Sequence, residues 1–196
     1  MKSIKSGAIA ALLGMGVTAA NALYSPQLTP SQLSLLATDS TLTGVGITVP
    51  VGFSDIAVTY LGTDAAFSNT LIHLASFTTL FNNLAAPLDT TVNISGVVPG
   101  ALVFQLLVDQ NGDGVFGPTD YVLNSATSFT RTITLNAYEY IVGFEDVRDS
   151  TGLVAGGDLD YNDIVFKVAI PEPGTYALLL AGLGVMGFIA MRRKVG

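Results

Sequence analysis

Short runs of alternating apolar and polar residues fill the middle of this 196-residue chain. In residues 127–135, serine or threonine occupies nearly every second position, and Phe129, Ile133 and Leu135 fall between them. A period of two is typical of strands that turn one face to a core. Similar runs occur at 45–51, 55–60, 91–98, 138–144 and 164–170, and 101–108 is almost continuously apolar, as in a strand buried on both faces. About eight short strands, separated by glycine and proline, predict an all-β fold: an antiparallel β-sandwich or jelly-roll-like domain.

Two segments depart from this pattern. Thr29-Pro30-Ser31-Gln32 combines a capping threonine, a proline at the first helical position and a glutamine three residues after the cap. It predicts a short helix that ends near Ala37. Residues 71–84 repeat leucine and phenylalanine at near-helical spacing, but their threonines and the Asn82-Asn83 pair favour a shorter element. The sequence does not decide between a helix and a shorter element for this segment.

The first 22 residues have the pattern of a signal peptide. Lys2 and Lys5 precede a small apolar run, and Ala20 and Ala22 supply the A-x-A pattern that signal peptidase accepts. Cleavage is therefore expected before Leu23. An N-terminal membrane anchor is the alternative.

The last 26 residues, 171–196, form a second segment that we set apart from the fold. Residues 176–191 carry no charge, and a helix of that length spans about 24 Å, close to a hydrocarbon core. The basic residues that follow are expected to stay in the cytoplasm. They are Arg192, Arg193 and Lys194. We therefore expect a transmembrane helix, and a buried core helix is the alternative.

The remaining residues, 23–170, are enough for one domain with a substantial core. They hold fourteen carboxylates against Arg131, Arg148 and Lys167, a net charge of −11. This balance excludes a nucleic-acid surface, which needs basic residues. The chain has no cysteine and a single histidine, His73, so thiol chemistry and multi-histidine zinc sites are excluded too.

A first acidic segment, 109–120, has the spacing of a calcium loop. Oxygen-bearing side chains fall at positions one, three and five, a glycine follows at position six, and a carboxylate closes the segment at position twelve. A backbone carbonyl at position seven completes the candidate ligands. They are Asp109, Asn111, Asp113, Val115 and Asp120. The alternative is a hairpin turn rich in aspartate, asparagine and glycine that needs no metal.

A second acidic segment surrounds a Gly156-Gly157 bend. Clustered carboxylates repel one another, and a bound divalent cation would neutralise them. The candidate ligands are Glu145, Asp146, Asp158, Asp160 and Asp163. The alternative is a solvated loop restrained by Arg148, with Asn162 shaping the turn through local hydrogen bonds.

This second segment resembles a known motif. The sequence Gly143-Phe144-Glu145-Asp146, followed by 157–168 (GDLDYNDIVFKV), is similar to the closing motif of an uncharacterised bacterial surface domain, in which a GFED segment precedes a D-x-D-[YF]-N-D strand. That domain occurs in exported and adhesin-like proteins and is presumed to bind calcium. The resemblance implies that both halves contribute to a calcium site. An insertion, 147–155, separates them here.

The tail resembles the PEP-CTERM sorting signal. Pro171-Glu172-Pro173, the apolar run and the final basic cluster carry this resemblance. It implies recognition by a membrane-embedded exosortase, removal of the helix and a Gram-negative source that makes exopolysaccharide. The protein is then expected to pass through a transient inner-membrane anchor to the cell surface or extracellular matrix.

We therefore expect a structural or adhesive surface module with calcium-filled loops, not an enzyme. The carboxylates fall in hydrophilic, glycine-rich segments, a poor setting for the raised pKa of a glycan hydrolase, and His73 lies in an apolar stretch typical of a core. The alternative is a calcium-dependent binder of exopolysaccharide or of other surface proteins. In that case exposed tyrosines would stack on sugars. The candidates are Tyr121, Tyr138 and Tyr161.

Overall fold

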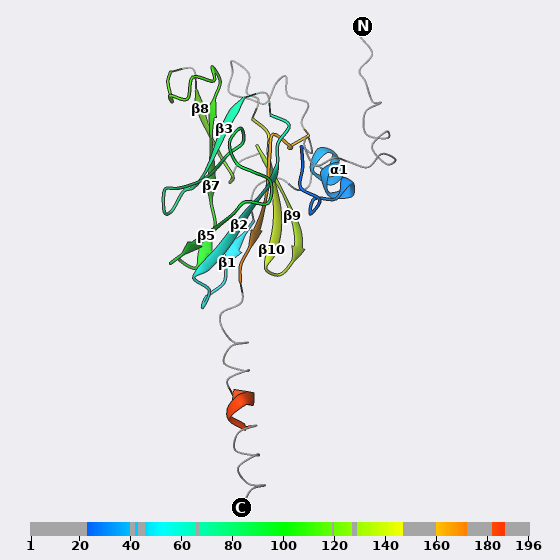
Figure 1. The fold of residues 1–196 in the computed structure, drawn as a ribbon, viewed down its shortest axis with the longest axis vertical. Coiled ribbons are helices and arrows are strands. Elements are labelled where there is room, and N and C mark those ends of the chain that lie inside the picture. The colour runs from blue at the N-terminus through cyan, green and yellow to red at the C-terminus, as the bar shows by residue number, and fades with distance from the viewer. Residues whose placement is uncertain are drawn as a thin grey trace, which may run out of the picture.

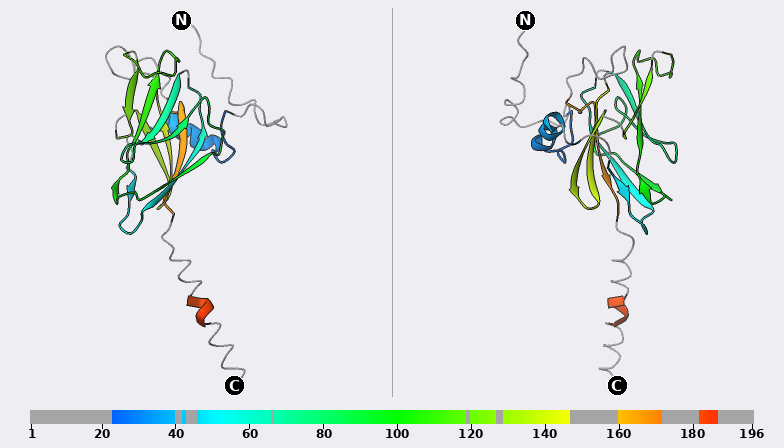
Figure 2. Two further views of the ribbon diagram at one scale, coloured as in Figure 1. Left: turned by 60° about the vertical axis from the view of Figure 1, so that its left-hand side comes forward. Right: turned by 180° about the vertical axis from the view of Figure 1, so that it is seen from behind.

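The computed structural model describes residues 23–39, 42, 46–65, 67–118, 120–126, 129–146, 160–171 and 182–186. Within these residues, eleven strands form three antiparallel sheets, and a helix, α1 (Pro30–Thr38), lies beside them (Figure 1). The two larger sheets pack face to face as a β-sandwich (Figure 2). The predicted antiparallel β-architecture is therefore confirmed.

The larger sheet has five strands in the order β5-β2-β11-β10-β9. Their bounds are β2 (Asp55–Gly62), β5 (Thr91–Ser95), β9 (Thr130–Asn136), β10 (Glu139–Phe144) and β11 (Ile164–Ala169). The opposing sheet has four strands in the order β4-β3-β7-β8. Their bounds are β3 (Ser68–His73), β4 (Thr78–Asn82), β7 (Phe104–Asp109) and β8 (Tyr121–Asn124). A small pair, β1 (Thr48–Val49) and β6 (Gly100–Ala101), completes the set.

The main core lies between these two sheets, because successive side chains of a strand point to opposite faces. In β7, the residues at every second position, from Phe104 to Val108, are buried. Phe104 meets Phe166 of the facing sheet edge-on, with ring centroids 5.0 Å apart. Aromatic pairs of this geometry add about 1 kcal/mol to the burial of their surfaces.

A second, smaller core lies on the outer face of the five-stranded sheet, where α1 packs. Both bonds of the expected capping box start this helix: Gln32 N donates to Thr29 Oγ1 at 3.3 Å, and Thr29 N donates to Gln32 Oε1 at 2.8 Å. Leu36 of α1 is fully buried against Val165 and other apolar residues of the sheet. Strand β11 is therefore covered on both faces.

The structure corrects several details of the predicted elements. Residues 71–84, with their near-helical spacing, lie largely in the β3–β4 hairpin, whose turn places Phe77 at a φ of +50°. The run 101–108 is divided between β6, which ends at Ala101, and β7, which alternates between buried and half-buried positions, so it is not one strand buried on both faces. In the described part of the run 45–51, which starts at residue 46, only Thr48–Val49 forms a strand. The short strands β6 and β8 were not predicted individually.

The terminal segments are described only in small part. The predicted signal peptide, with Ala20 and Ala22, lies outside the described residues, as do Glu172, Pro173, Arg192, Arg193 and Lys194. Within the predicted transmembrane segment, 182–186 are described and are helical. In the described part of the chain, no helix is both long and apolar enough to cross a membrane.

Candidate functional site

The two halves of the GFED and DYND motif meet at one end of the sandwich. Glu145 and Asp146 directly follow β10, and Asp163 directly precedes β11. The antiparallel register pairs Phe144 with Ile164, so the residues that flank this pair must lie side by side. The insertion, 147–155, falls outside the described residues, as do 156–159, and Glu145 and Asp146 nevertheless meet Asp163.

Three carboxylates are buried at this meeting point, and we call Glu145, Asp146 and Asp163 the buried acidic cluster. Glu145 and Asp146 are fully buried, and 7% of Asp163 is exposed. Backbone groups bind them: Asp146 N donates to Asp163 Oδ2 at 2.6 Å, and Tyr161 N donates to Glu145 Oε2 at 3.3 Å. The expectation of hydrophilic surroundings is therefore wrong for these residues.

The opposing sheet contributes an asparagine that the sequence analysis did not identify. Asn69 of β3 is fully buried, and its Nδ2 donates to Asp146 Oδ2 at 2.5 Å. Its backbone is held by Asn83: Asn69 N donates to Asn83 Oδ1 at 2.8 Å, and Asn83 N donates to Asn69 O at 3.0 Å. One signal was available in the sequence. Asn69 lies two residues before Leu71 and four before His73, so in a strand its side chain lies on the same buried face as theirs.

A short chain of contacts connects Asn83 to the third carboxylate. Asn83 Nδ2 donates to Phe67 O at 2.9 Å and to Thr63 Oγ1 at 3.4 Å. The Thr63 hydroxyl in turn donates to the backbone carbonyl of Asp163. The cluster is therefore a junction between the two sheets, built by β3, β10, β11 and the segment that follows β2.

Electrostatic repulsion is strong in this junction. Burial, together with the charges of Asp146, Glu145 and Asp160, raises the pKa of Asp163 to about 9, and the hydrogen bond from Asp146 N opposes this only in part. The described basic side chains are engaged elsewhere. Arg131 lies 4.0 Å from the centroid of the Tyr161 ring and donates to the Leu36 carbonyl, and Lys167 Nζ donates to Gln27 Oε1 at 3.0 Å.

The oxygen atoms at this junction match the ligand chemistry of a hard cation. Asn69 Oδ1 is buried and accepts no hydrogen bond. Asp146 and Glu145 contribute buried carboxylates, whose Oδ2 and Oε2 accept hydrogen bonds from Asn69 Nδ2 and Tyr161 N. Carboxylate and amide oxygens are the ligands that calcium prefers. Among the described residues, no group of three or more His, Cys, Asp or Glu has the arrangement of a metal site, and Asp158 lies outside them.

Asp160 belongs to a local turn beside the cluster. Asn162 N donates to Asp160 Oδ1 at 3.2 Å, and the Asn162 side-chain amide donates to Asp160 Oδ2. Asn162 therefore shapes this turn through local bonds. Tyr161, between them, has a φ of +55°, and its buried ring covers Arg131.

The first acidic segment, 109–120, folds differently, and we call it the exposed acidic loop. Its aspartates accept backbone hydrogen bonds from within the loop. Asp109 accepts from Gly112 N at 2.7 Å and from Gly114 N at 2.8 Å, and Asp120 accepts from Gln110 N at 2.9 Å and from Gly117 N at 2.6 Å. Residues 110–116, which include Asn111, Asp113 and Val115, are exposed. This geometry is that of the alternative, a turn closed by its own side chains, and calcium in this loop stays a prediction.

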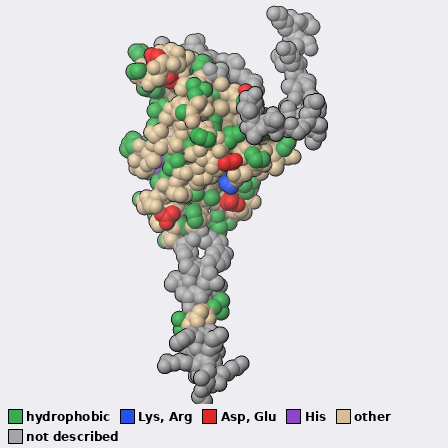
Figure 3. Space-filling view, in the orientation of Figure 1, with side chains coloured by type: hydrophobic (Ala, Val, Ile, Leu, Met, Phe, Trp, Pro, Cys, Tyr) green, Lys and Arg blue, Asp and Glu red, His purple; other side chains and the backbone are tan. Residues whose placement is uncertain are grey.

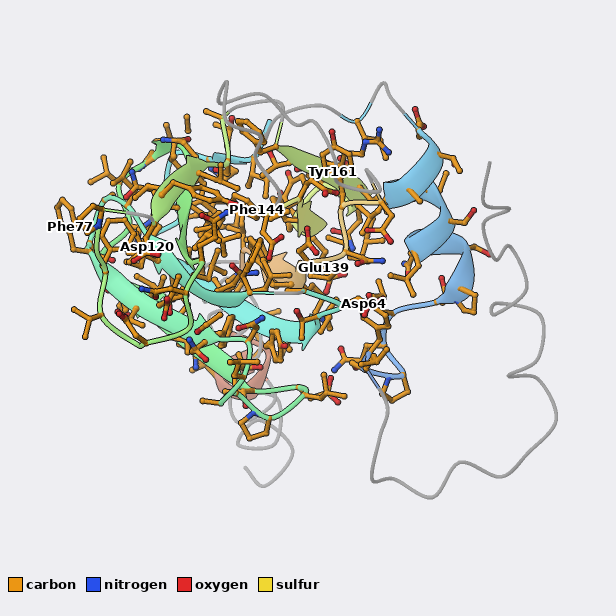
Figure 4. The ribbon with its side chains drawn as sticks, turned by 90° about the horizontal axis from the view of Figure 1, so that it is seen from above. Asp64, Phe77, Asp120, Glu139, Phe144 and Tyr161 are labelled. Carbon is orange, nitrogen blue, oxygen red and sulfur yellow. The ribbon has the colours of Figure 1, made fainter. Side chains whose placement is uncertain are left out.

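The two acidic regions lie at the same end of the sandwich. The Tyr121 hydroxyl, directly after the loop, donates to the backbone carbonyl of Asp146. Figure 4, viewed from that end, places Asp120 on the side of the four-stranded sheet and Tyr161 on the side of α1, with Phe144 between them. In the space-filling view the exposed carboxylates form small separate groups (Figure 3). No broad acidic face appears there.

Two of the three predicted sugar-stacking tyrosines are not on the surface. Only 8% of Tyr121 and 7% of Tyr161 is exposed, because Tyr121 closes the main core and Tyr161 the smaller one. Tyr138 is half-buried and stacks on Phe53, with ring centroids 5.2 Å apart. His73 is buried, as expected of a core residue, and its Nδ1 bonds to Ser76 Oγ at 2.7 Å.

Comparison with known proteins identifies the tail. Residues 169–194 match the family of the PEP-CTERM protein-sorting motif. The sequence matches no curated protein. The match confirms the resemblance seen in Pro171-Glu172-Pro173 and the residues that follow. The chain therefore carries a PEP-CTERM sorting signal, which supports an exported protein that is sorted through the membrane by an exosortase.

Proposed function

We propose that this protein is a structural or adhesive module of the cell surface or extracellular matrix, and that calcium bound at the buried acidic cluster fastens its two sheets together. The observation that carries the proposal is the meeting of three buried carboxylates with the Asn69 side-chain amide of the opposing sheet, whose Oδ1 is buried and accepts no hydrogen bond. The sorting signal supports delivery to the outside of the cell.

Asp146, Asp163 and Asn69 are the residues that we expect to hold the ion, with Glu145 beside them. Bound calcium supplies the positive charge that this low-dielectric junction needs. Extracellular calcium sites typically bind at roughly 10⁻⁴–10⁻³ M, so the ion would be present wherever calcium is millimolar. A tenfold excess over the dissociation constant, reached by millimolar calcium at the tight end of this range, stabilises a protein by about 1.4 kcal/mol.

A structural role has more support than a catalytic one. The raised pKa of Asp163 resembles that of a general acid, but a catalytic acid must reach its substrate. Glu145 and Asp146 are fully buried, and the described hollow at Tyr138 and Glu139 lies at the opposite end of β10. We therefore propose no reaction at this cluster.

The carbohydrate-binding alternative has less support. It relied on exposed tyrosines, and two of the three are buried. Of the three, Tyr138 is half-buried, so binding to exopolysaccharide or to other surface proteins would use Tyr138 or other residues. A glycan array probed with and without a calcium chelator would reveal it.

The proposal is tested by thermal unfolding of the full-length protein in mild detergent, with millimolar calcium or with a chelator. Calcium is expected to raise the Tm by roughly 3–6 °C, the equivalent of about 1.4 kcal/mol in a chain of this size. Asp163→Asn should abolish the shift. It should also leave the chelated protein at least as stable as the wild type. The raised pKa of Asp163 lowers stability at neutral pH because the folded protein must take up a proton there, whereas asparagine has no such cost and keeps an oxygen that can accept from Asp146 N.

Asp113→Asn, in the exposed acidic loop, is the matched control and should keep the full shift. A calcium shift that is absent from the wild type contradicts the proposal. A shift that disappears in Asp113→Asn but persists in Asp163→Asn would move the site to the exposed acidic loop.

A further inference from the structure

The sorting signal begins inside the folded domain. The matched segment starts at Ala169, which pairs with Glu139 of β10 and with Ala57 of β2. Ile170 follows, is 2% exposed within the main core, and its N donates to Tyr138 O at 2.8 Å. Pro171 is the first exposed residue. No spacer therefore separates the core from the Pro-Glu-Pro motif.

A hollow adjoins the point where the motif leaves the domain. It has a volume of about 400 Å³ and lies between the β9–β10 turn and the end of β11, at the lower end of the domain in Figure 1. Its lining residues are Asn136, Ala137, Tyr138, Glu139, Ala169, Ile170 and Pro171. Two contacts hold lining side chains in place: Tyr138 stacks on Phe53, and Asn136 Nδ2 donates to Glu139 Oε2 at 2.6 Å.

The sequence also limits how far this hollow can lie from the membrane. Five residues, 171–175, separate Ile170 from the apolar run that starts at Tyr176. Fully extended, they reach at most about 17 Å. While the apolar run is in the bilayer, the hollow must stay close to the membrane surface, where a membrane-embedded enzyme presents its extracytoplasmic side.

We infer that this hollow is the docking surface for the exosortase that recognises Pro171-Glu172-Pro173, an inference that rests on the exosortase sorting in the proposed function. An enzyme that binds this motif also contacts residues on both sides of it. On the N-terminal side those residues are not free chain, because Ala169 is paired in the sheet and Ile170 is buried. The enzyme therefore meets the hollow itself, and the folded domain is part of the substrate.

Pulse-chase processing of the full-length protein in cells that contain the exosortase tests this inference. Ala137→Trp places a large side chain in the hollow, and Ala126→Trp, after β8, is the matched change on another exposed turn. A second pair uses a Gly-Ser-Gly-Ser insertion. Placed between Ile170 and Pro171, it separates the motif from the hollow; placed between Thr175 and Tyr176, it lengthens the tether but keeps the motif at the hollow.

Ala137→Trp and the insertion after Ile170 are expected to slow processing about tenfold, the effect of losing roughly 1.4 kcal/mol of docking energy. Ala126→Trp and the insertion after Thr175 should be processed at the wild-type rate. Wild-type or faster processing with the insertion after Ile170 overturns the docking surface, because the motif alone is then sufficient. A variant with Pro171-Glu172-Pro173 changed to three alanines tests the exosortase sorting itself. If that variant is processed at the wild-type rate, the sorting is contradicted.

Discussion

The buried acidic cluster and the exposed acidic loop are alike in composition but opposite in structure. In the loop, the aspartates accept hydrogen bonds from backbone groups of the same loop, and 110–116 are exposed to solvent. In the cluster, Glu145 and Asp146 are fully buried and a partner comes from the facing sheet. The loop can satisfy its charges with water and its own amides, whereas the cluster depends on groups brought from elsewhere.

This difference shows that spacing alone does not indicate which acidic segment needs an ion. The loop has the better calcium spacing, but a solvated turn costs little without metal. The cluster has irregular spacing, but carboxylates close together away from water repel strongly. Burial, which depends on strand pairing, is therefore the stronger argument for a cation.

The largest expected effect comes from the glycine that supports the cluster. A Cβ on Gly143 would lie 2.1 Å from Tyr161 O and 3.0 Å from Leu36 Cδ1, and neither the turn nor α1 can move away freely. Gly143→Ala should lower the free energy of unfolding by about 3 kcal/mol or more, as measured by urea denaturation. Gly114→Ala, in the exposed acidic loop, meets open space but has a φ of +75°, and should cost about 1 kcal/mol. Equal losses would contradict the contrast between a packed and a solvated region.

Two asparagines give the next comparison. Asn69→Ala removes the bond to Asp146 Oδ2 and an oxygen that we assign to the ion, so we expect a loss of about 2 kcal/mol in calcium-containing buffer. Asn111→Ala, in the exposed acidic loop, should change stability by about 0.5 kcal/mol. Chemical denaturation measures both. A larger loss for Asn111→Ala would reverse our assignment of the two regions.

A smaller effect is expected from the contact that joins the two regions. Tyr121→Phe removes the hydroxyl that donates to the Asp146 carbonyl and should cost about 1 kcal/mol. Tyr140→Phe is the matched control, because the Tyr140 hydroxyl donates to Ala137 O at 3.1 Å in an exposed setting and should contribute little. If both variants melt at the wild-type temperature, the joining contact contributes nothing to stability.

The smallest effect concerns pH and lies at the other end of β3. Burial lowers the pKa of His73 below its ordinary value of 6.5. The unfolded chain therefore takes up this proton first as the pH falls, so His73 lowers stability progressively below about pH 6.5. When the pH is lowered from 7 to 5, the Tm of His73→Gln should fall less than the Tm of the wild type. An identical loss in both proteins would show that His73 does not titrate differently on unfolding.

Local signals were sufficient to predict much of the fold. The capping box of Thr29 and Gln32 starts α1 as expected, and the alternating runs predicted at β2, β9, β10 and β11 are strands, although burial alternates along only part of each. Residues 71–84 were ambiguous because a hairpin with apolar residues on both strands imitates helical spacing. The turn at Phe77, with its positive φ, has no glycine to mark it.

The candidate site was predictable only in part. The meeting of Glu145-Asp146 with Asp163 follows from antiparallel pairing of the strands that flank them. The contribution of Asn69 depends on how the two sheets face each other, which no local pattern specifies. The burial of Tyr121 and Tyr161 has the same cause, since each closes a core built from distant segments.

Anomalous diffraction from crystals of the full-length protein grown in millimolar calcium tests the central claim most directly. The account predicts an ion about 2.3–2.6 Å from Asn69 Oδ1 and from an oxygen of Asp146 or Asp163. An ion found only among Asp109, Asp113 and Asp120, or no ion at either region, would contradict it.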